Sequence, residues 1–151
     1  MPSSSPLIPR TARFADLDAP TLYALLRLRV DVFVVEQECA YPELDGRDTD
    51  PTTRHVWLGD ADGAPLAYLR VLREPEGARI GRVVTAPAAR GRGLAARLLV
   101  AALDELPGEV VRLAAQTHAT GLYEWHGFTP DGPEFLEDGI AHLPMIRRVP
   151  R

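Results

Sequence analysis

The chain has 151 residues, a formal net charge of −4, and contents of 46% hydrophobic and 25% charged residues. This balance is typical of one globular domain with a substantial core, and the acidic net charge argues against a nucleic-acid partner. A single cysteine, Cys39, excludes an intramolecular disulfide and fits a reducing compartment. Because no signal-peptide pattern and no apolar run of about 18 residues is present, we expect a cytoplasmic protein without a membrane partner.

The first third of the chain predicts a tail, a helix and a long loop. Residues 1–10 hold three prolines and three serines, so we expect a flexible tail before a single domain at 11–151. Apolar residues recur at helical spacing over 22–35, and Asp18 or Thr21 could cap that helix. Residues 37–54 are polar and rich in turn residues, which predicts a long loop.

The remaining segments predict strands and helices in a mixed order. Two apolar runs flank the turn sequence Asp60-Ala61-Asp62-Gly63 and predict a β-hairpin over 55–72. Further elements are expected as a strand over 78–84, a helix over 94–106, a strand over 109–116, a short helix over 121–125 and two short strands around residues 138–139. This order predicts an α/β (α+β) domain with helices against a mixed sheet, and it lacks the regular alternation of a doubly wound fold.

The segment AARGRGLAARLLVAAL, residues 88–103, predicts an anion site at the start of a helix. The first N–H groups of a helix lack partners and carry partial positive charge. Gly91 and Gly93 leave this backbone bare, while Arg90 and Arg92 add charge and forked donors that match phosphate oxygens. A diphosphate is the most natural ligand. Two alternatives are a plain turn and a dinucleotide fingerprint, and the fingerprint would need the glycines directly after a strand.

Four segments together resemble a known enzyme family. The spacing Arg90-x-x-Gly93-x-Ala95 resembles the acyl-coenzyme A signature of the Gcn5-related N-acetyltransferase (GNAT) family. The stretch from Tyr123 to Phe128 resembles the family's Tyr-x-x-x-Gly-Phe element, and LYALLRLRVDVFVVEQECAYPELDGRD and FLEDGIAHLPM resemble its ElaA-like branch. The resemblance spans about residues 22–146. It implies the GNAT acyl-CoA N-acyltransferase fold, with a central, mostly antiparallel mixed sheet flanked by helices.

The resemblance also implies an activity and a cosubstrate site. It implies an N-acetyltransferase that moves an acetyl group from acetyl-CoA to a primary amine of a small molecule or peptide, by direct attack in a ternary complex. The alternative is a non-catalytic module that binds or senses acyl-CoA on the same fold. The expected cosubstrate contacts are Val83, Val84, Thr85, Arg90, Gly91, Arg92, Gly93, Leu94, Ala95, Gln116 and Tyr123. No metal is expected, and exposed late strands could pair with a second copy to form a homodimer.

The motif match makes Tyr123 the candidate general acid, because a phenol is protonated at neutral pH and can donate to a thiolate. Gln116 stands where many relatives carry Asn, and strand 78–84 lacks the glutamate that some relatives use as a base. Four other side chains are candidate bases: His118, Glu36, Glu38 and His55. Of these, His118 and Glu36 are preferred. A chain of water molecules without a dedicated base is a further alternative.

The sequence also predicts the location of several other polar and aromatic residues. The resemblance implies a site or sheet-edge role for His142, although packing is the preferred expectation. Trp57 and Trp125 are expected in the core or in a pocket wall. The acidic segment PELDGRD, residues 42–48, could attract a cationic amine or form a solvated loop.

Overall fold

The computed structural model describes residues 7–148, and these form one eight-stranded sheet in the order β1-β2-β3-β4-β5-β8-β6, with β7 also paired to β8. The strands are β1 (Arg10–Ala12), β2 (Arg54–Gly59), β3 (Pro65–Glu74), β4 (Gly77–Thr85), β5 (Val111–Gln116), β6 (Thr129–Pro130), β7 (Phe135–Glu137) and β8 (Ile140–Arg147). Strands β4 and β5 run parallel, while the other neighbours are antiparallel. The expected mixed, mostly antiparallel sheet is confirmed.

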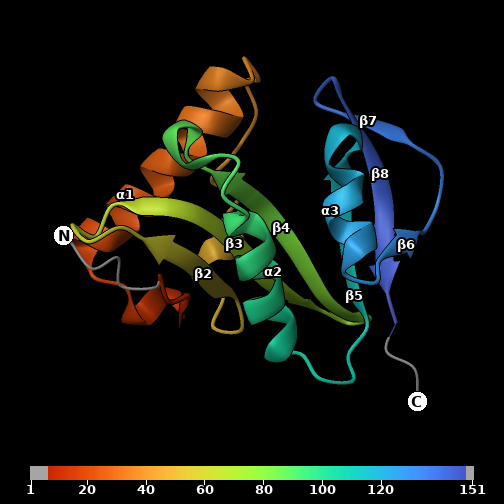
Figure 1. Ribbon diagram of the computed structural model, residues 1–151, viewed down its shortest axis with the longest axis horizontal. Helices are drawn as coiled ribbons and strands as arrows, with labels where there is room; N and C mark the ends of the chain where they lie inside the picture. The colour runs from red at the N-terminus through yellow and green to blue at the C-terminus, as the bar shows by residue number, and fades with distance from the viewer. Residues whose placement is uncertain (1–6, 149–151) are drawn as a thin grey trace.

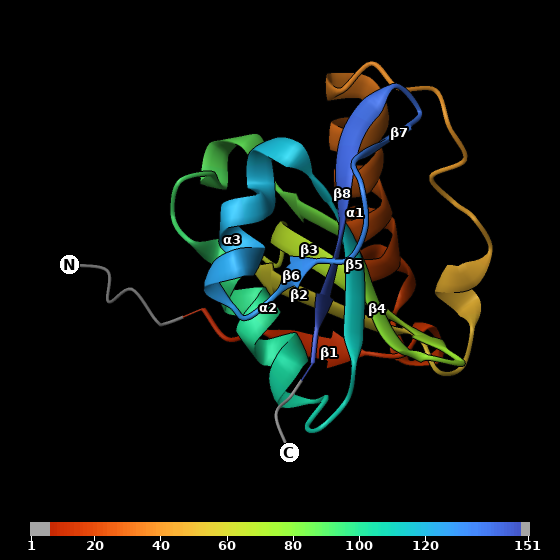
Figure 2. The same cartoon turned by 90° about the vertical axis from the view of Figure 1, so that its right-hand side faces the viewer.

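Helices cover both faces of this sheet. The longer ones are α1 (Ala19–Val30), which continues as the π-helical η2 (Asp31–Glu36), α2 (Leu94–Asp104) and α3 (Thr120–Trp125); the 3-10 turns are η1 (Phe14–Asp16), η3 (Arg47–Thr49), η4 (Pro87–Ala89) and η5 (Thr117–Ala119). Figures 1 and 2 show α2 and α3 on one face and α1 on the other. The Asp18 side chain accepts a hydrogen bond from the Thr21 N–H at 2.8 Å, which confirms Asp18 as the cap of α1.

Alternation along the strands divides the buried side chains between the two faces. Val56 and Leu58 of β2 and Leu69 of β3 belong to the main core under α2 and α3. Trp57 and Tyr68, one residue out of phase, belong to a smaller core under α1. Trp57 is therefore in the core, as expected.

Trp125 does not lie in the core or in a pocket wall, because its side chain is 87% exposed. The short helix α3 buries Tyr123 against the sheet. Two positions along a helix correspond to about 200° of rotation, so Trp125 faces the opposite way.

The acidic segment at residues 42–48 forms buried ion pairs beneath α1. Arg29, 1% exposed, donates to Glu43 at 2.7 Å and to Asp48 at 2.8 Å, and Arg70 donates to Asp48 and Asp45. Burial alone would raise the pKa of Asp48, but the hydrogen bonds and charge of Arg29 hold this pKa below its usual value. The expectation of a solvated loop is wrong for Glu43 and Asp48, which are buried and hold the loop to the sheet. A sequence pattern does not reveal which arginines these carboxylates meet. The expectation that the segment attracts a cationic amine stays a prediction.

Some boundaries also differ from the expectations. Arg10 already belongs to β1 and pairs with Trp57 of β2, while residues 1–6 of the expected tail lie outside the described residues. The sequence did not predict β1 or β6, because strands of three and two residues carry no readable alternation. Strand β8 is eight residues long rather than short. No helix in the described part of the chain is long and apolar enough to cross a membrane.

Candidate active site

A gap opens in the middle of the sheet between the two parallel strands. Strands β4 and β5 pair only at Ala78 with Val111 and at Arg79 with Arg112, and then diverge, as Figure 1 shows. From residue 80 to residue 85, β4 pairs with β3 on one side and borders the gap on the other. A cavity of about 750 Å³ occupies this gap, with walls from η2, β4, β5, α3 and the β7–β8 turn.

A bulge in β4 accompanies the gap. The register between β3 and β4 shifts between Tyr68 and Arg70, and Arg82 opposite has a φ of 55°. A bulge inserts a residue, bends the strand and increases its twist, which helps β4 turn away from β5. Because of the shift, Val83 packs on the main core while the next residue, Val84, packs under α1. Nothing in the sequence predicted this bulge, since arginine has no preference for positive φ.

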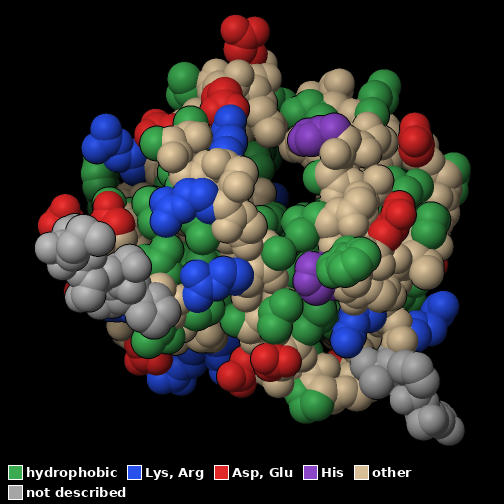
Figure 3. Space-filling model, viewed as in Figure 1, with side chains coloured by type: hydrophobic (Ala, Val, Ile, Leu, Met, Phe, Trp, Pro, Cys, Tyr) green, Lys and Arg blue, Asp and Glu red, His purple; other side chains and the backbone are tan. Residues whose placement is uncertain are grey.

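The loop before α2 has the bare backbone that an anion site requires. Gly91 and Gly93 have φ values of 80° and 71°, and Gly93 is the N-cap of α2 without any side-chain cap. Within residues 7–148, no hydrogen-bond acceptor is found for the N–H groups of residues 93–96. A Cβ added at either glycine would meet nothing within 4 Å, so this backbone is open to approach. Figure 3 shows arginine side chains around the start of α2, beside a hollow in this face.

Arg90 forms an ion pair across the mouth of the cavity with Glu36, at the end of η2. The two guanidinium N–H groups donate to the two carboxylate oxygens at 2.8 and 2.9 Å, and Arg90 Nε donates to the Thr85 carbonyl at 3.3 Å. The hydrogen bonds from Arg90 lower the pKa of Glu36. A carboxylate with a lowered pKa is a weaker base, so this pairing argues against Glu36 as the proton acceptor.

Tyr123 lines the cavity from the α2 and α3 face. Its side chain is 6% exposed, and its ring meets Phe128 edge-on at a centroid distance of 6.0 Å. Burial raises the pKa of Tyr123 to about 12, so the hydroxyl stays protonated at neutral pH. In the described part of the chain its hydroxyl has no hydrogen-bond partner and is not sealed from solvent. It is therefore available as a donor to a ligand.

The candidate bases are distributed between the cavity and the protein interior. His118, on η5, and Glu36 both line the cavity, whereas His55 and Glu38 do not. His55 is 2% exposed and bonds through its two ring nitrogens to the Tyr68 hydroxyl at 2.6 Å and the Asp48 carbonyl at 3.0 Å. It supports the buried ion pairs, and burial lowers its pKa.

The expected cosubstrate residues fall into two groups. Those that line the cavity are Val83, Val84, Thr85, Arg90, Ala95, Gln116 and Tyr123. The others, Gly91, Arg92, Gly93 and Leu94, lie in the adjoining loop and helix start; the Leu94 side chain is buried in the core, so only its backbone can reach a ligand. Gln116 donates to the Gln37 side chain at 3.4 Å. Within residues 7–148, no group of three His, Cys, Asp or Glu side chains could hold a metal ion.

Comparisons with known proteins agree with this geometry. The Acetyltransferase (GNAT) domain family matches residues 30–149. UPF0039 protein Rv2851c of Mycobacterium tuberculosis is 54% identical over 136 residues, 87% of each chain, and Protein ElaA of Escherichia coli is 38% identical over 142 residues, 89% of this chain and 92% of that one.

Solved structures match over nearly the full length. An acyl-CoA N-acyltransferase from Pseudomonas aeruginosa has a TM-score of 0.87 with 43% identity, covering 94% of this chain and 99% of that one. Escherichia coli ElaA has a TM-score of 0.88 with 35% identity, covering 95% and 100%. The chain therefore belongs to the GNAT acetyltransferase family, in its ElaA-like branch.

Proposed function

We propose that this protein transfers an acetyl group from acetyl-CoA to a primary amine of a small molecule or peptide, in a ternary complex. One observation carries the proposal. The four N–H groups of residues 93–96, for which residues 7–148 offer no acceptor, adjoin a cavity that runs between β4 and β5 to the Tyr123 side chain. A ligand with a diphosphate at one end and a thioester at the other matches both features.

The residues present fit coenzyme A. The uncapped N–H groups and the side chains of Arg90 and Arg92 supply donors and positive charge for a diphosphate. The unpaired edge of β4 at residues 80–85 offers backbone donors and acceptors to the amide groups of the pantetheine arm, as an additional strand would. Gly93, by carrying no side chain, leaves the approach to the helix start open.

The chemistry requires two proton transfers around the thioester. A primary amine, like lysine with a reference pKa of about 10.4, must lose a proton before it attacks. The sulfur that leaves needs a proton or a hydrogen bond, and the hydroxyl of Tyr123 can supply it. Alignment of the two substrates in the gap contributes further, because orientation alone removes a large part of the barrier.

A non-catalytic module that binds acyl-CoA is the second candidate. Such a module needs the diphosphate site but has no need of an acid beside the sulfur. The Tyr123 hydroxyl, which has no hydrogen-bond partner among the described residues, favours the enzyme.

The proposed function is tested by thiol release from acetyl-CoA in the presence of a panel of amines, polyamines, amino acids and peptides. We expect thiol release that depends on both substrates, together with a melting temperature that rises with coenzyme A concentration by mass action. A rise in melting temperature without thiol release for any amine would support the binding module. Neither effect at millimolar coenzyme A would reject both.

A further inference from the structure

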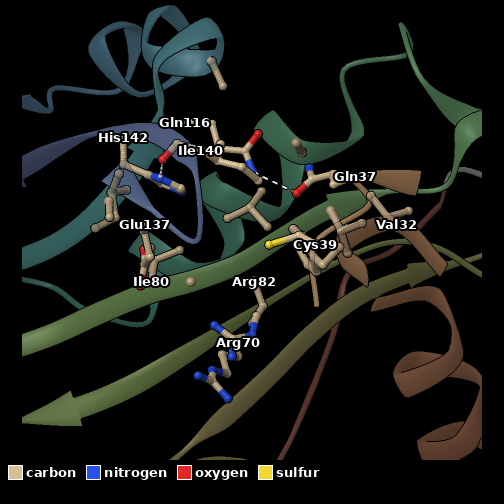
Figure 4. A pocket seen from close by; sticks show the side chains of 18 of the residues that line it. Val32, Gln37, Cys39, Arg70, Ile80, Arg82, Gln116, Glu137, Ile140 and His142 are labelled. Carbon is tan, nitrogen blue, oxygen red and sulfur yellow. Dashed lines mark hydrogen bonds between the residues drawn. The ribbon is translucent and has the colours of Figure 1, made fainter. Parts of the chain in front are cut away.

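His142 packs against Phe135 and also lies on the cavity wall, so its ring is open to a role beyond packing. It belongs to β8, where it pairs with Gln116 of β5, and its half-buried ring lines the cavity. Figure 4 shows His142 and Gln116 at the same end of the cavity, with Glu137 and Ile140 close by. The ring is therefore accessible to a ligand in the gap.

One hydrogen bond defines the proton position on this ring. His142 Nδ1 lies 2.7 Å from the backbone carbonyl of Ile140, drawn in Figure 4. A carbonyl oxygen can only accept, so Nδ1 carries the hydrogen and the neutral ring keeps its lone pair on Nε2. Phe135 stacks on the ring at a centroid distance of 5.7 Å and an interplanar angle of 23°, which holds its plane. This is the arrangement of an oriented proton acceptor.

His142 and Tyr123 reach the gap from opposite faces of the sheet. Tyr123 packs in the main core under α2 and α3, together with Leu113 and Met145. Gln116 and His142 alternate with these residues along β5 and β8, so their side chains lie on the opposite face of the sheet. On that face the Gln116 side chain donates to Gln37, which follows η2. Attack on a thioester needs proton removal at the incoming amine and proton delivery at the departing sulfur, so two groups on opposite sides of the gap suit the two tasks.

We propose that Nε2 of His142 is the general base that takes the proton from the acceptor amine; the proposal rests on the proposed function. The ammonium gives one proton to Nε2, and the freed lone pair forms the C–N bond to the acetyl carbon. The C–S bond breaks, its electron pair goes to sulfur, and the Tyr123 hydroxyl protonates that sulfur. The second proton lost by the nitrogen replaces the one on Tyr123, so the net release is one proton from His142 to solvent.

The charged groups around His142 suit a cationic acceptor. The charged and titratable side chains that line the cavity, besides His142 and Tyr123, are Glu137 of β7, Asp138 of the β7–β8 turn, His118 of η5, Cys39, Glu36, Tyr41, Asp45, Arg47, Arg70, Arg79, Arg82 and Arg90. Each of these arginines already forms an ion pair with a carboxylate: Arg47 and Arg79 with Glu74, Arg70 with Asp45, Arg82 with Glu43, and Arg90 with Glu36. The facing residue on β5, Gln116, is neutral. Two carboxylates at this end place negative charge where an ammonium enters, which favours its approach.

His142→Gln tests the assignment, with His126→Gln as the matched control. His126 also bonds through Nδ1 to a backbone carbonyl, that of Leu122 at 2.8 Å, but it does not line the cavity. We expect His142→Gln to lower kcat on the order of 10²-fold or more near pH 7, and the loss to shrink as pH approaches the amine's own pKa. We expect His142→Gln to keep the melting-temperature rise with coenzyme A. We expect His126→Gln to keep the wild-type kcat and pH profile.

Three outcomes overturn the assignment. One is a His142→Gln variant within about twofold of wild-type kcat, with an unchanged pH profile. Another is a large loss of kcat in His118→Gln with His142→Gln active. The third outcome does not depend on turnover. We expect ¹⁵N NMR of the free protein to show the neutral His142 ring protonated at Nδ1, and protonation at Nε2 instead would contradict the assignment. No thiol release by the wild-type protein would reject the proposed function and, with it, this role.

Discussion

At the scale of single residues, the environment of Tyr123 determines how a phenol can act as an acid. Desolvation disfavours the phenolate, and this raises the pKa of Tyr123 to about 12. The protonated form is the one that donates, and it persists at every pH below that value. The Tyr123 contribution should therefore be constant across the pH range in which an acetyltransferase can be assayed.

Tyr123→Phe removes the hydroxyl and keeps the ring that packs on Phe128. We expect kcat to fall about 10²-fold, and this factor to be the same at each pH from about 6 to 10. Coenzyme A binding should be retained. Tyr23→Phe is the control, because the Tyr23 side chain is 72% exposed on α1 and does not line the cavity. Steady-state kinetics at several pH values provides the measurement, and an unchanged kcat would remove Tyr123 from the mechanism.

At the scale of elements, the ion pair between Glu36 and Arg90 joins the end of η2 to the loop before α2. Arg90 is the residue that the motif assigns to the diphosphate, yet its N–H groups donate to the Glu36 carboxylate. A bound diphosphate has to share Arg90 with Glu36 or displace it. The carboxylate is therefore a competitor for the anion site.

Glu36→Gln removes this competitor and one negative charge near the diphosphate. We expect coenzyme A to bind a few-fold more tightly, with a smaller difference at high salt because the groups are exposed. Asp62→Asn, in the β2–β3 turn, is the control for a loss of charge elsewhere. Calorimetric titration at two ionic strengths measures the effect. If binding is unchanged but kcat collapses, Glu36 is the base and our assignment of the ion pair is wrong.

The elements differ in how far the sequence predicts them. The β2–β3 hairpin, β4, α2 and β5 follow from alternation, helical spacing and turn residues, and each is present within a few residues of its expected bounds. The gap between β4 and β5 does not follow, because it depends on a bulge at Arg82 that no local preference favours. Local patterns report which face a side chain takes, whereas the divergence of two strands is a property of the assembled sheet.

At the scale of the whole molecule, the sequence pointed to the residues of the proposed cosubstrate site but not to those of the proposed acceptor site. Arg90, Gly93 and Tyr123 stand at fixed spacings within short segments, so a motif captures them. The proposed proton acceptor depends on residues brought together from β5, β7 and β8, and the tautomer of His142 depends on a carbonyl two residues away. The sequence also did not predict the buried carboxylates that pair with Arg29, because these pairs depend on how the loop packs.

The central claim is that coenzyme A binds through its diphosphate to the backbone at the start of α2, and calorimetric titration of Gly93→Asp tests it most directly. Gly63→Asp is the matched control: Gly63 has a φ of 85° against 71° for Gly93, and a Cβ at either position meets nothing within 4 Å. The two variants thus carry similar backbone strain and the same added charge. We predict that Gly93→Asp weakens coenzyme A binding at least tenfold, by roughly 1.4 kcal/mol or more, while Gly63→Asp binds like the wild type. Equal affinities of the two variants would contradict the account.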